Sequence, residues 1–248
     1  MRTAWTIARR EMFAYFVSPI AYVVTTVWLL WCGLTFYTLA GFFAGQTALS
    51  ASMSPLSAFF GGSVLFFIPL LVFAPVLTMR LLAEERNAGT LEPLLTAPVT
   101  TAQVVLGKYL AAVVFWVALW VPTLMYVWIT HQFGSVDLGA VAASYVGVTG
   151  IGLYYMAIGL AMSAVSKNQI VAALLTFMVL GALFVAGLLT YVESLSEYHS
   201  ALEYISLWGH MQSFAKGVVD TRFVVFDLSL AAFFVFVAWR ALEGRRWQ

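Results

Sequence analysis

Six long runs of apolar residues divide the chain, with short polar stretches between them. A helix that crosses the hydrocarbon core of a bilayer needs about 20 predominantly apolar residues, and each run is long enough. Because lipid cannot satisfy free backbone groups, we expect each run to be helical. The pattern predicts six membrane-spanning helices in one membrane domain covering residues 1–248, at Ile20–Ala44, Leu56–Leu82, Thr101–Thr130, Leu138–Val165, Gln169–Val192 and Phe223–Ala241.

Local signals mark where several of these helices begin. A Ser-Pro pair opens the first two spans, at Ser18 and at Ser54, and this is a favoured cap followed by proline in the first turn. Thr100 and Gln103 have the spacing of a capping box before the third span. Prolines inside spans predict kinks that serve either packing or gating, at Pro69, Pro75 and Pro122.

The first eighteen residues predict a short helix at the membrane interface. At helical spacing, one face is apolar and the opposite face is polar. The apolar face holds Trp5, Ala8, Met12, Tyr15 and Phe16, whereas the polar side holds Thr3, Thr6 and Arg10, with Arg9 beside it. The alternative is an unstructured tail.

The segment 193–222 predicts short helices outside the membrane, packed on or dipping into the outer leaflet. Apolar residues recur there at helical spacing, at Leu195, Tyr198, Leu202 and Ile205. The pairs His199/Glu203 and Glu193/Glu197 have the spacing of metal ligands on one helical face. We interpret them as a solvated polar face and predict no metal site.

Composition agrees with an all-α integral membrane protein. The chain is 62% hydrophobic and 9% charged, whereas soluble domains are about 25% charged. This deficit leaves too little polar surface to cover a water-soluble body. Cys32 is the only cysteine, which excludes a disulfide within the chain.

The basic residues predict the orientation. Those that flank one side of the predicted membrane are Arg2, Arg9, Arg10, Arg80, Arg86, Lys108, Lys167, Arg240, Arg245 and Arg246, whereas the other side has Lys216 and Arg222. Cytoplasmic loops carry the excess of Lys and Arg. Both termini and the segment 84–100 are therefore expected in the cytoplasm.

The sequence lacks the motifs of common enzymes. It has no HExxH zinc helix, no GxSxG elbow and no paired-aspartate motif. Gly107-Lys108 resembles the end of a phosphate-binding loop, but Ala102 replaces its first glycine and Tyr109 follows the lysine. We therefore predict that the chain is not an enzyme and holds no nucleotide, cofactor or metal. Asp227 lies near the outer end of the last span, where we expect hydration, and this weakens the case for a proton- or sodium-driven carrier.

The segment 84–100, EERNAGTLEPLLTAPVT, is the most polar interruption in the chain. Gly89 ends the preceding helix, and Thr90 can cap a new one with Glu92 in its first turn. Pro93 is tolerated there because first-turn amides have no partner within the helix. Leucines at 91, 94 and 95 give it an apolar face. The predicted short helix either lies on the inner leaflet or docks a soluble partner.

This segment and its continuation resemble a loop in permease subunits of the type-2 ABC exporter superfamily. The shared elements are Glu84-Glu85-Arg86, Gly89-Thr90-Leu91-Glu92, Leu94-Leu95, Pro98 and Gly107-Lys108. ARREMFAYFVSPIAY resembles the family's interfacial helix, and SAVSKNQIVAALLTF resembles its turn between the fourth and fifth spans. SFAKGVVDTRFVVFDLSLAAFFVF is similar to the last span of gliding-motility-type permeases. Pro93 departs from the family's pattern.

The resemblance implies an assembly of two permeases, of this chain or a paralogue, with two cytoplasmic ABC ATPases that bind ATP and Mg²⁺. The loop helix would couple ATP hydrolysis to transport, through Glu84, Glu85, Arg86, Gly89, Thr90, Leu91, Glu92, Leu94 and Leu95. It further implies a bacterial inner-membrane exporter in contact with lipid, with a periplasmic accessory protein as a further partner and no nucleic acid. The alternatives are a mechanotransmission permease acting on a periplasmic partner, and a secondary carrier or channel.

Overall fold

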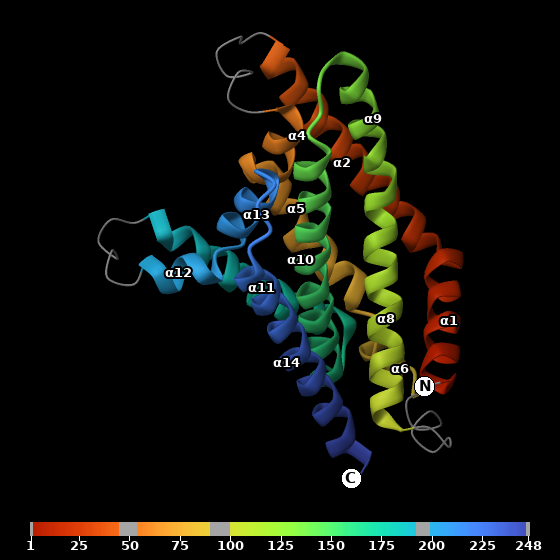
Figure 1. Cartoon of the computed structure of the whole chain (residues 1–248). Coiled ribbons are helices and arrows are strands. Elements are labelled where there is room, and N and C mark those ends of the chain that lie inside the picture. Colours follow the sequence, from red (N-terminus) through yellow and green to blue (C-terminus); the bar gives the residue numbers. More distant parts are fainter. Residues whose placement is uncertain (1, 45–53, 90–99, 192–198, 247–248) are drawn as a thin grey trace.

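The structure is a computed structural model that describes residues 2–44, 54–89, 100–191 and 199–246. All regular elements in these ranges are helical, which confirms the predicted fold class. Figure 1 shows the long helices running side by side, with the N- and C-terminal ends of the chain toward the same end of the bundle.

The helices follow one another with short connections. Their bounds are α1 (Arg2–Val17), α2 (Pro19–Ala44), α4 (Pro55–Ser57), η1 (Ala58–Gly62), α5 (Val64–Thr78), α6 (Ala83–Asn87), α8 (Thr101–Trp120), η2 (Val121–Thr123), α9 (Leu124–Phe133), α10 (Leu138–Val165), α11 (Gln169–Leu188), η3 (Leu189–Tyr191), α12 (His199–Ile205), α13 (Leu207–Ala215) and α14 (Thr221–Arg246).

Five helices in the described ranges are long and apolar enough to cross a membrane, and one bent pair makes a sixth candidate. The five are α2, α8 with α9, α10, α11 and α14. The predicted fourth span has the bounds of α10, Leu138–Val165. The last span extends beyond the predicted 223–241 at both ends, because α14 covers Thr221–Arg246.

The second span, predicted over residues 56–82 with kinks at Pro69 and Pro75, is bent at Ser63 instead. The part made of α4 and η1 meets α5 at an angle of 47°. Ser63 between them is extended, with φ −118° and ψ 128°, and its side chain accepts a hydrogen bond from the amide of Leu65. A side chain at Gly61 would collide with the backbone and side chains of α13, so this bend brings two backbones together.

Prolines do not cause that bend. Pro69 and Pro75 both lie inside α5, which continues as one helix across them. Pro122 lies in η2, a short 3₁₀ turn that joins α8 to α9. At the start of α8 the predicted capping box is confirmed, since Thr100 and Gln103 exchange side-chain-to-backbone hydrogen bonds of 3.3 Å.

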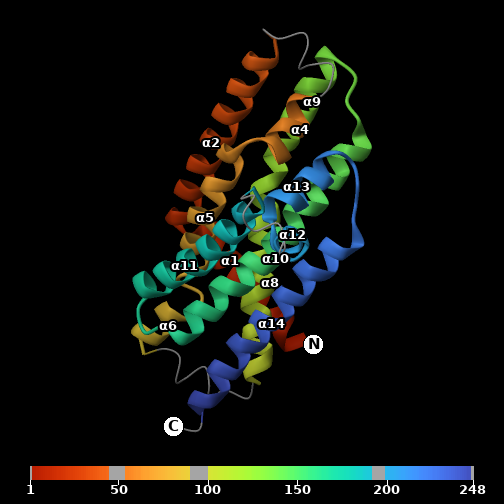
Figure 2. The ribbon, with the colours of Figure 1, turned by 90° about the vertical axis from the view of Figure 1, so that its left-hand side faces the viewer.

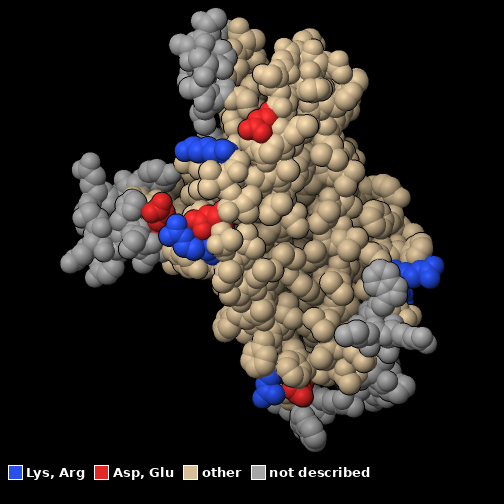
Figure 3. Space-filling view, viewed as in Figure 1, with Lys and Arg blue, Asp and Glu red and all other residues tan. Residues whose placement is uncertain are grey.

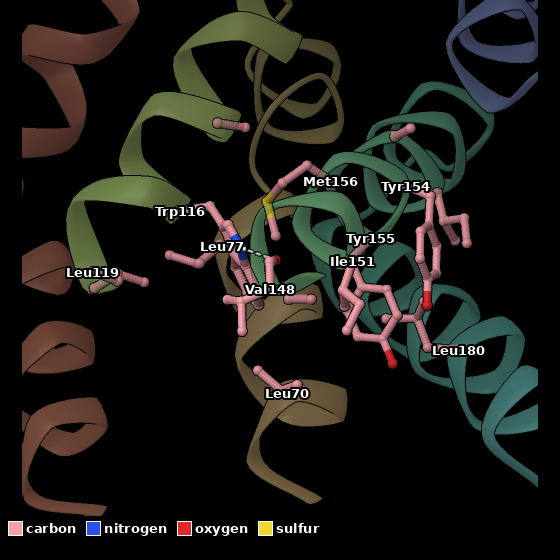
Figure 4. Close-up of a cluster of buried hydrophobic side chains, with 14 of the residues drawn as sticks. Leu70, Leu77, Trp116, Leu119, Val148, Ile151, Tyr154, Tyr155, Met156 and Leu180 are labelled. Carbon is pink, nitrogen blue, oxygen red and sulfur yellow. Dashed lines mark hydrogen bonds between the residues drawn. The ribbon is translucent and has the colours of Figure 1, made fainter. Parts of the chain in front are cut away.

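Helix α10 lies at the centre of the bundle and is buried along most of its length. It packs against α5, α8, α11, α13 and α14 (Figure 2). Small residues allow this close packing, because a Cβ at Gly152 would overlap the indole of Trp116. That indole donates a hydrogen bond of 3.2 Å to the carbonyl of Val148, and Figure 4 shows it among the buried side chains around α10.

The outer helices expose large apolar side chains, as expected of surfaces that face lipid. Leu30 and Tyr37 on α2, Met178 on α11 and Phe233 on α14 are all more than half exposed. On the face that Figure 3 shows, a broad central area carries no charged side chain. The chain is therefore a multi-pass membrane protein.

Candidate functional site

A buried lysine joins three helices at the end of the bundle where the chain begins. The ammonium of Lys108, on α8, lies 2.8 Å from Oε1 of Glu85 on α6 and 3.3 Å from Oε2 of Glu11 on α1. The Lys108 side chain is 2% exposed. Burying an ammonium is costly unless opposite charges and hydrogen bonds compensate it, and two carboxylates do so here. We call Glu11, Glu85 and Lys108 the junction.

Helix α1 is held in place by aromatic packing next to the junction. The hydroxyl of Tyr15 donates a hydrogen bond of 2.8 Å to the carbonyl of Leu77 on α5. Its ring stacks on Phe115 of α8 with centroids 5.1 Å apart. Burial and then the nearby charge of Glu11 raise the pKa of Tyr15, so the phenol keeps the proton that it donates. Glu11 is thereby presented to Lys108 by a fixed helix.

The residues predicted to form the interfacial helix have different surroundings. Met12 is half-buried, while Phe16 is 46% exposed and Arg9 and Arg10 are exposed. Arg10 pairs with its neighbour Glu11 at 3.2 Å, and the guanidinium of Arg9 lies over the ring of Phe13. The side chain of Trp5 lies outside the described part of the structure.

The turn between α5 and α6 is held by a serine from α10. The backbone amides of Leu82 and Ala83 each donate a hydrogen bond of 3.0 Å to Oγ of Ser163. The same hydroxyl donates to the carbonyl of Met79 at 3.1 Å. Because α6 has no side-chain cap of its own, Ser163 supplies one from a distant helix. Local capping rules therefore could not identify this residue.

Arg86 fixes the other side of α6 to the same helix. Its Nη1 donates hydrogen bonds of 3.2 Å and 3.0 Å to the carbonyls of Val165 and Ser166, where α10 ends. A guanidinium is favourable there because the carbonyl end of a helix carries partial negative charge. Glu84 instead makes an exposed ion pair with Arg80, with a distance of 3.6 Å between Nε and Oε2.

The structure describes some of the predicted coupling residues and leaves the others undescribed. Thr90, Leu91, Glu92, Leu94 and Leu95 lie outside the described residues, so the helix predicted there stays a prediction. Gly89, just before it, has φ +69°, a conformation that favours glycine and ends α6. After it, the Thr100 cap starts α8. The segment 90–99 is therefore attached at both ends to elements that the junction joins.

A cavity of about 230 Å³ adjoins the junction between α1, α2, α5, α6 and α8. Its polar wall includes Glu11, Arg80, Glu84, Glu85 and Lys108. Gly107-Lys108, which resembles part of a phosphate loop, lies inside helix α8, with the ammonium engaged by carboxylates. In the ranges that the structure describes, no group of three or more His, Cys, Asp or Glu residues could hold a metal.

The expectation that water hydrates Asp227 is wrong. Asp227 is 1% exposed, and its carboxylate faces His210 of α13 and the backbone of Gly150 on α10. The sequence places Asp227 near a helix end, but α13 folds back against the bundle and covers it. The predicted short helices before the last span are present as α12 and α13 in the part that is described.

The comparisons with known proteins agree with this architecture. A family model described as "ABC-2 family transporter protein" matches residues 5–240. A search of curated proteins found no match. The family match covers the junction, the segment 84–100, the first five candidate spans and the last span as far as residue 240.

Proposed function

The chain belongs to the ABC-2 transporter family, and on that premise we propose that its junction transmits the motion of an ATPase into the membrane. Members of this family are membrane permease subunits, and each pairs with a cytoplasmic ABC ATPase that is a separate subunit. The chain is accordingly the permease subunit of an ABC transporter. The finer proposal is an exporter in a bacterial inner membrane, with both termini in the cytoplasm.

The observation that carries the proposal is the buried ion cluster around Lys108. A force applied to the segment 90–99 reaches Gly89 and Thr100, and the helices at those positions are α6 and α8. The ion pair between Glu85 and Lys108, with 2.8 Å between Oε1 and Nζ, joins these two helices. Glu11 adds α1 through its own ion pair with Lys108. Ser163 and Arg86 extend the connection to α10 at the centre of the bundle. A docked ATPase would thus move four helices together.

The positions of the basic residues support a cytoplasmic location for the junction. Arg9, Arg10, Arg80, Arg86 and Lys108 belong to elements at the junction end, as does the C-terminal Arg240 (Figure 1). Cytoplasmic loops carry such an excess. We propose an assembly of two permeases, this chain or a paralogue, with two ATPases that bind ATP and Mg²⁺.

A double substitution in the docking segment tests the proposal. Glu92→Arg with Leu94→Asp reverses one charge and removes one apolar contact from the predicted docking helix. In the complex purified from native membranes with its ATPase, we expect this variant to lose most ATPase copurification while the permease stays folded. The measurement is the ATPase-to-permease ratio together with the melting temperature of the permease.

A matched control lies on the opposite side of the chain's predicted topology. Lys216→Glu with Val218→Asp makes similar changes at two exposed positions between α13 and α14. This control is expected to keep the wild-type ratio. Undiminished ATPase binding by the Glu92/Leu94 variant would refute docking through this segment.

A further inference from the structure

A second buried pair of ionisable groups lies on α13 and α14. Nδ1 of His210 is 3.7 Å from Oδ1 of Asp227, and the two side chains are 1% and 2% exposed. Asp227 lies six residues into α14, about 9 Å along the helix from its start. Ionisable groups within a membrane span are costly to bury, and their presence is a reason to look for function.

The hydrogen bond made by Nε2 of His210 determines which nitrogen of the neutral imidazole carries no hydrogen. Nε2 of His210 lies 3.0 Å from the backbone carbonyl of Tyr204. A carbonyl only accepts, so Nε2 must carry the hydrogen of this bond. In a neutral imidazole Nδ1 is then a bare acceptor, and it faces a carboxylate oxygen that is also an acceptor. Neither atom has another hydrogen-bond partner among the described residues.

One additional proton resolves this conflict. Placed on Nδ1 it makes an imidazolium beside a carboxylate, and placed on Oδ1 it makes a carboxylic acid that can donate to Nδ1. Both arrangements have no net charge, which matters in a dry environment. Without that proton, a buried negative charge faces a lone pair. Nδ1 of His210 and Oδ1 of Asp227 can therefore form a hydrogen bond with each other only when the pair holds one proton.

Among the residues that the structure describes around the pair, no other charged group takes the place of this proton. The rings of Phe223 and Phe226 pack on the imidazole with centroids at 4.0 Å and 5.6 Å. The titratable groups that face the pair from the described elements are Tyr154 and Tyr155 on α10, Tyr204 on α12 and Asp220 before α14. Asp220 is engaged by Arg222 at 2.9 Å, and a tyrosine is ordinarily neutral near pH 7.

Steric access to the pair is through a cavity next to Asp227. A cavity of about 340 Å³ between α10 and α14 reaches Asp227, with Tyr145, Thr149 and Phe214 in its wall. A Cβ at Gly150 would lie 2.6 Å from Oδ2, so the carboxylate fills the space beside that glycine. Asp227 is 2% exposed, and this cavity provides the path by which a proton could reach its carboxylate.

We propose that His210 and Asp227 form a site that binds one proton and, while protonated, holds α13 against α14. This site is independent of the coupling function proposed above. Loss of the proton leaves two acceptors facing each other, which weakens the contact between these helices. Alkaline conditions should therefore loosen α13 from the last span.

The sign of the pH effect follows from proton counting. In an unfolded chain, histidine loses its proton at about pH 6.5 and aspartate at about pH 3.9, so above about pH 6.5 the two together hold less than one proton. The folded pair holds one. Stability falls with rising pH wherever the folded state binds more protons, so the contribution of this pair is present below about pH 6.5 and is lost above it.

Asp227→Asn provides the sharpest test, because a carboxamide carries a fixed N–H donor for Nδ1 and needs no proton. The melting temperature of the purified full chain in mild detergent is measured from pH 6 to pH 9. We expect the wild type to lose stability relative to Asp227→Asn as the pH rises. His131→Gln and His199→Gln, the other two histidines, should keep the wild-type profile.

Nitrogen NMR of ¹⁵N-histidine-labelled protein gives a second readout that does not depend on unfolding. We expect the Nδ1 signal of His210 to titrate in the wild type and to stay that of the Nε2-protonated neutral ring in Asp227→Asn. The two other histidine variants assign the remaining signals. Identical His210 titrations with and without the carboxylate, or parallel melting profiles for the two proteins, would overturn the proposal.

Discussion

The junction and the His210–Asp227 pair are both buried and both join helices, but they satisfy their charges differently. Lys108 has two carboxylates within 3.3 Å, whereas His210 and Asp227 are 3.7 Å apart and each keeps an atom without a hydrogen-bond partner in the described structure. Fixed opposite charges make the first a permanent joint. The second depends on a proton that can leave. Burial alone therefore does not distinguish a rigid element from a switchable one.

Helix α10 connects the two places. Ser163 and the last carbonyls of α10 hold α6 beside the junction, while Gly150 accommodates the carboxylate of Asp227. A movement of α10 would therefore displace residues at both the junction and the His210–Asp227 pair. The following substitutions separate the permanent joint from the rest of the bundle.

Removing the charge of Lys108 should have the largest effect. Lys108→Met leaves Glu11 and Glu85 close together without their cation, and breaking a buried ion pair in this way costs about 3–5 kcal/mol of unfolding free energy. The exposure of the two carboxylates, 14% and 20%, places the expected loss near the lower end of that range. Thermal unfolding in detergent measures it. The control Lys167→Met removes an exposed lysine, and an equal loss in both would refute the special role of Lys108.

Filling the contact between α10 and α5 should have the next largest effect. A Cβ at Gly159 would overlap the side chain of Thr78, which is buried and donates to the carbonyl of Ala74 at 2.8 Å. Overpacking of this kind costs about 1–3 kcal/mol, so Gly159→Ala should lower the melting temperature clearly. Gly181→Ala on α11 meets nothing within 4 Å and should be neutral or slightly stabilising. Similar losses in both variants would contradict the packing described for Gly159.

Arg86→Gln should have a smaller effect. It removes the two charge-assisted hydrogen bonds to the end of α10, and partial exposure limits the expected loss to about 1 kcal/mol. Hydrogen exchange provides the more specific readout, since the amides of α6 should exchange faster while those of α10 stay protected. Unchanged exchange in α6 would show that Arg86 does not hold this helix.

Asp220→Asn should have the smallest effect. Hydrogen bonds from the side chain and the backbone amide of Arg222, together with its charge, lower the pKa of Asp220, but the Arg222 side chain is 77% exposed to solvent. A lowered pKa means that any stabilisation is present above the usual carboxyl range and is lost as the pH falls through the lowered value. We expect no measurable change in melting temperature at pH 7. A clear loss would mean that Asp220 supports the nearby His210.

The features that the sequence predicted correctly depend on neighbours along the chain. The capping box of Thr100 and Gln103 needs residues three apart, and the bounds of α10 follow from an uninterrupted apolar run. The bend at Ser63 was missed because prolines were the expected cause, whereas the bend accommodates α13 against Gly61. That contact joins residues far apart in the sequence, which periodicity cannot reveal.

The candidate site was predictable only in part for the same reason. The sequence indicated that Glu85 and Lys108 belong to one functional loop region, but it did not indicate their ion pair or the addition of Glu11. Ser163, which holds the turn before α6, gave no local signal because its partners lie about 80 residues away. Asp227 was misplaced because helix position predicts depth but not which neighbouring helix covers the side chain.

The central claim is that Lys108 carries ATPase motion from the docking segment into the membrane helices, and a single spin label tests it most directly. Cys32 is the only native cysteine and is buried, so Phe133→Cys, at an exposed position at the far end of α9, can be labelled selectively. The label's spectrum is compared in the ATPase complex without nucleotide and after trapping with ATP and vanadate.

We expect trapping to change the spectrum at position 133 in the otherwise wild-type permease. In Lys108→Met complexes that retain the ATPase and still hydrolyse ATP, the change should be lost, while Lys167→Met should keep it. An undiminished change in the Lys108→Met complex would contradict the account.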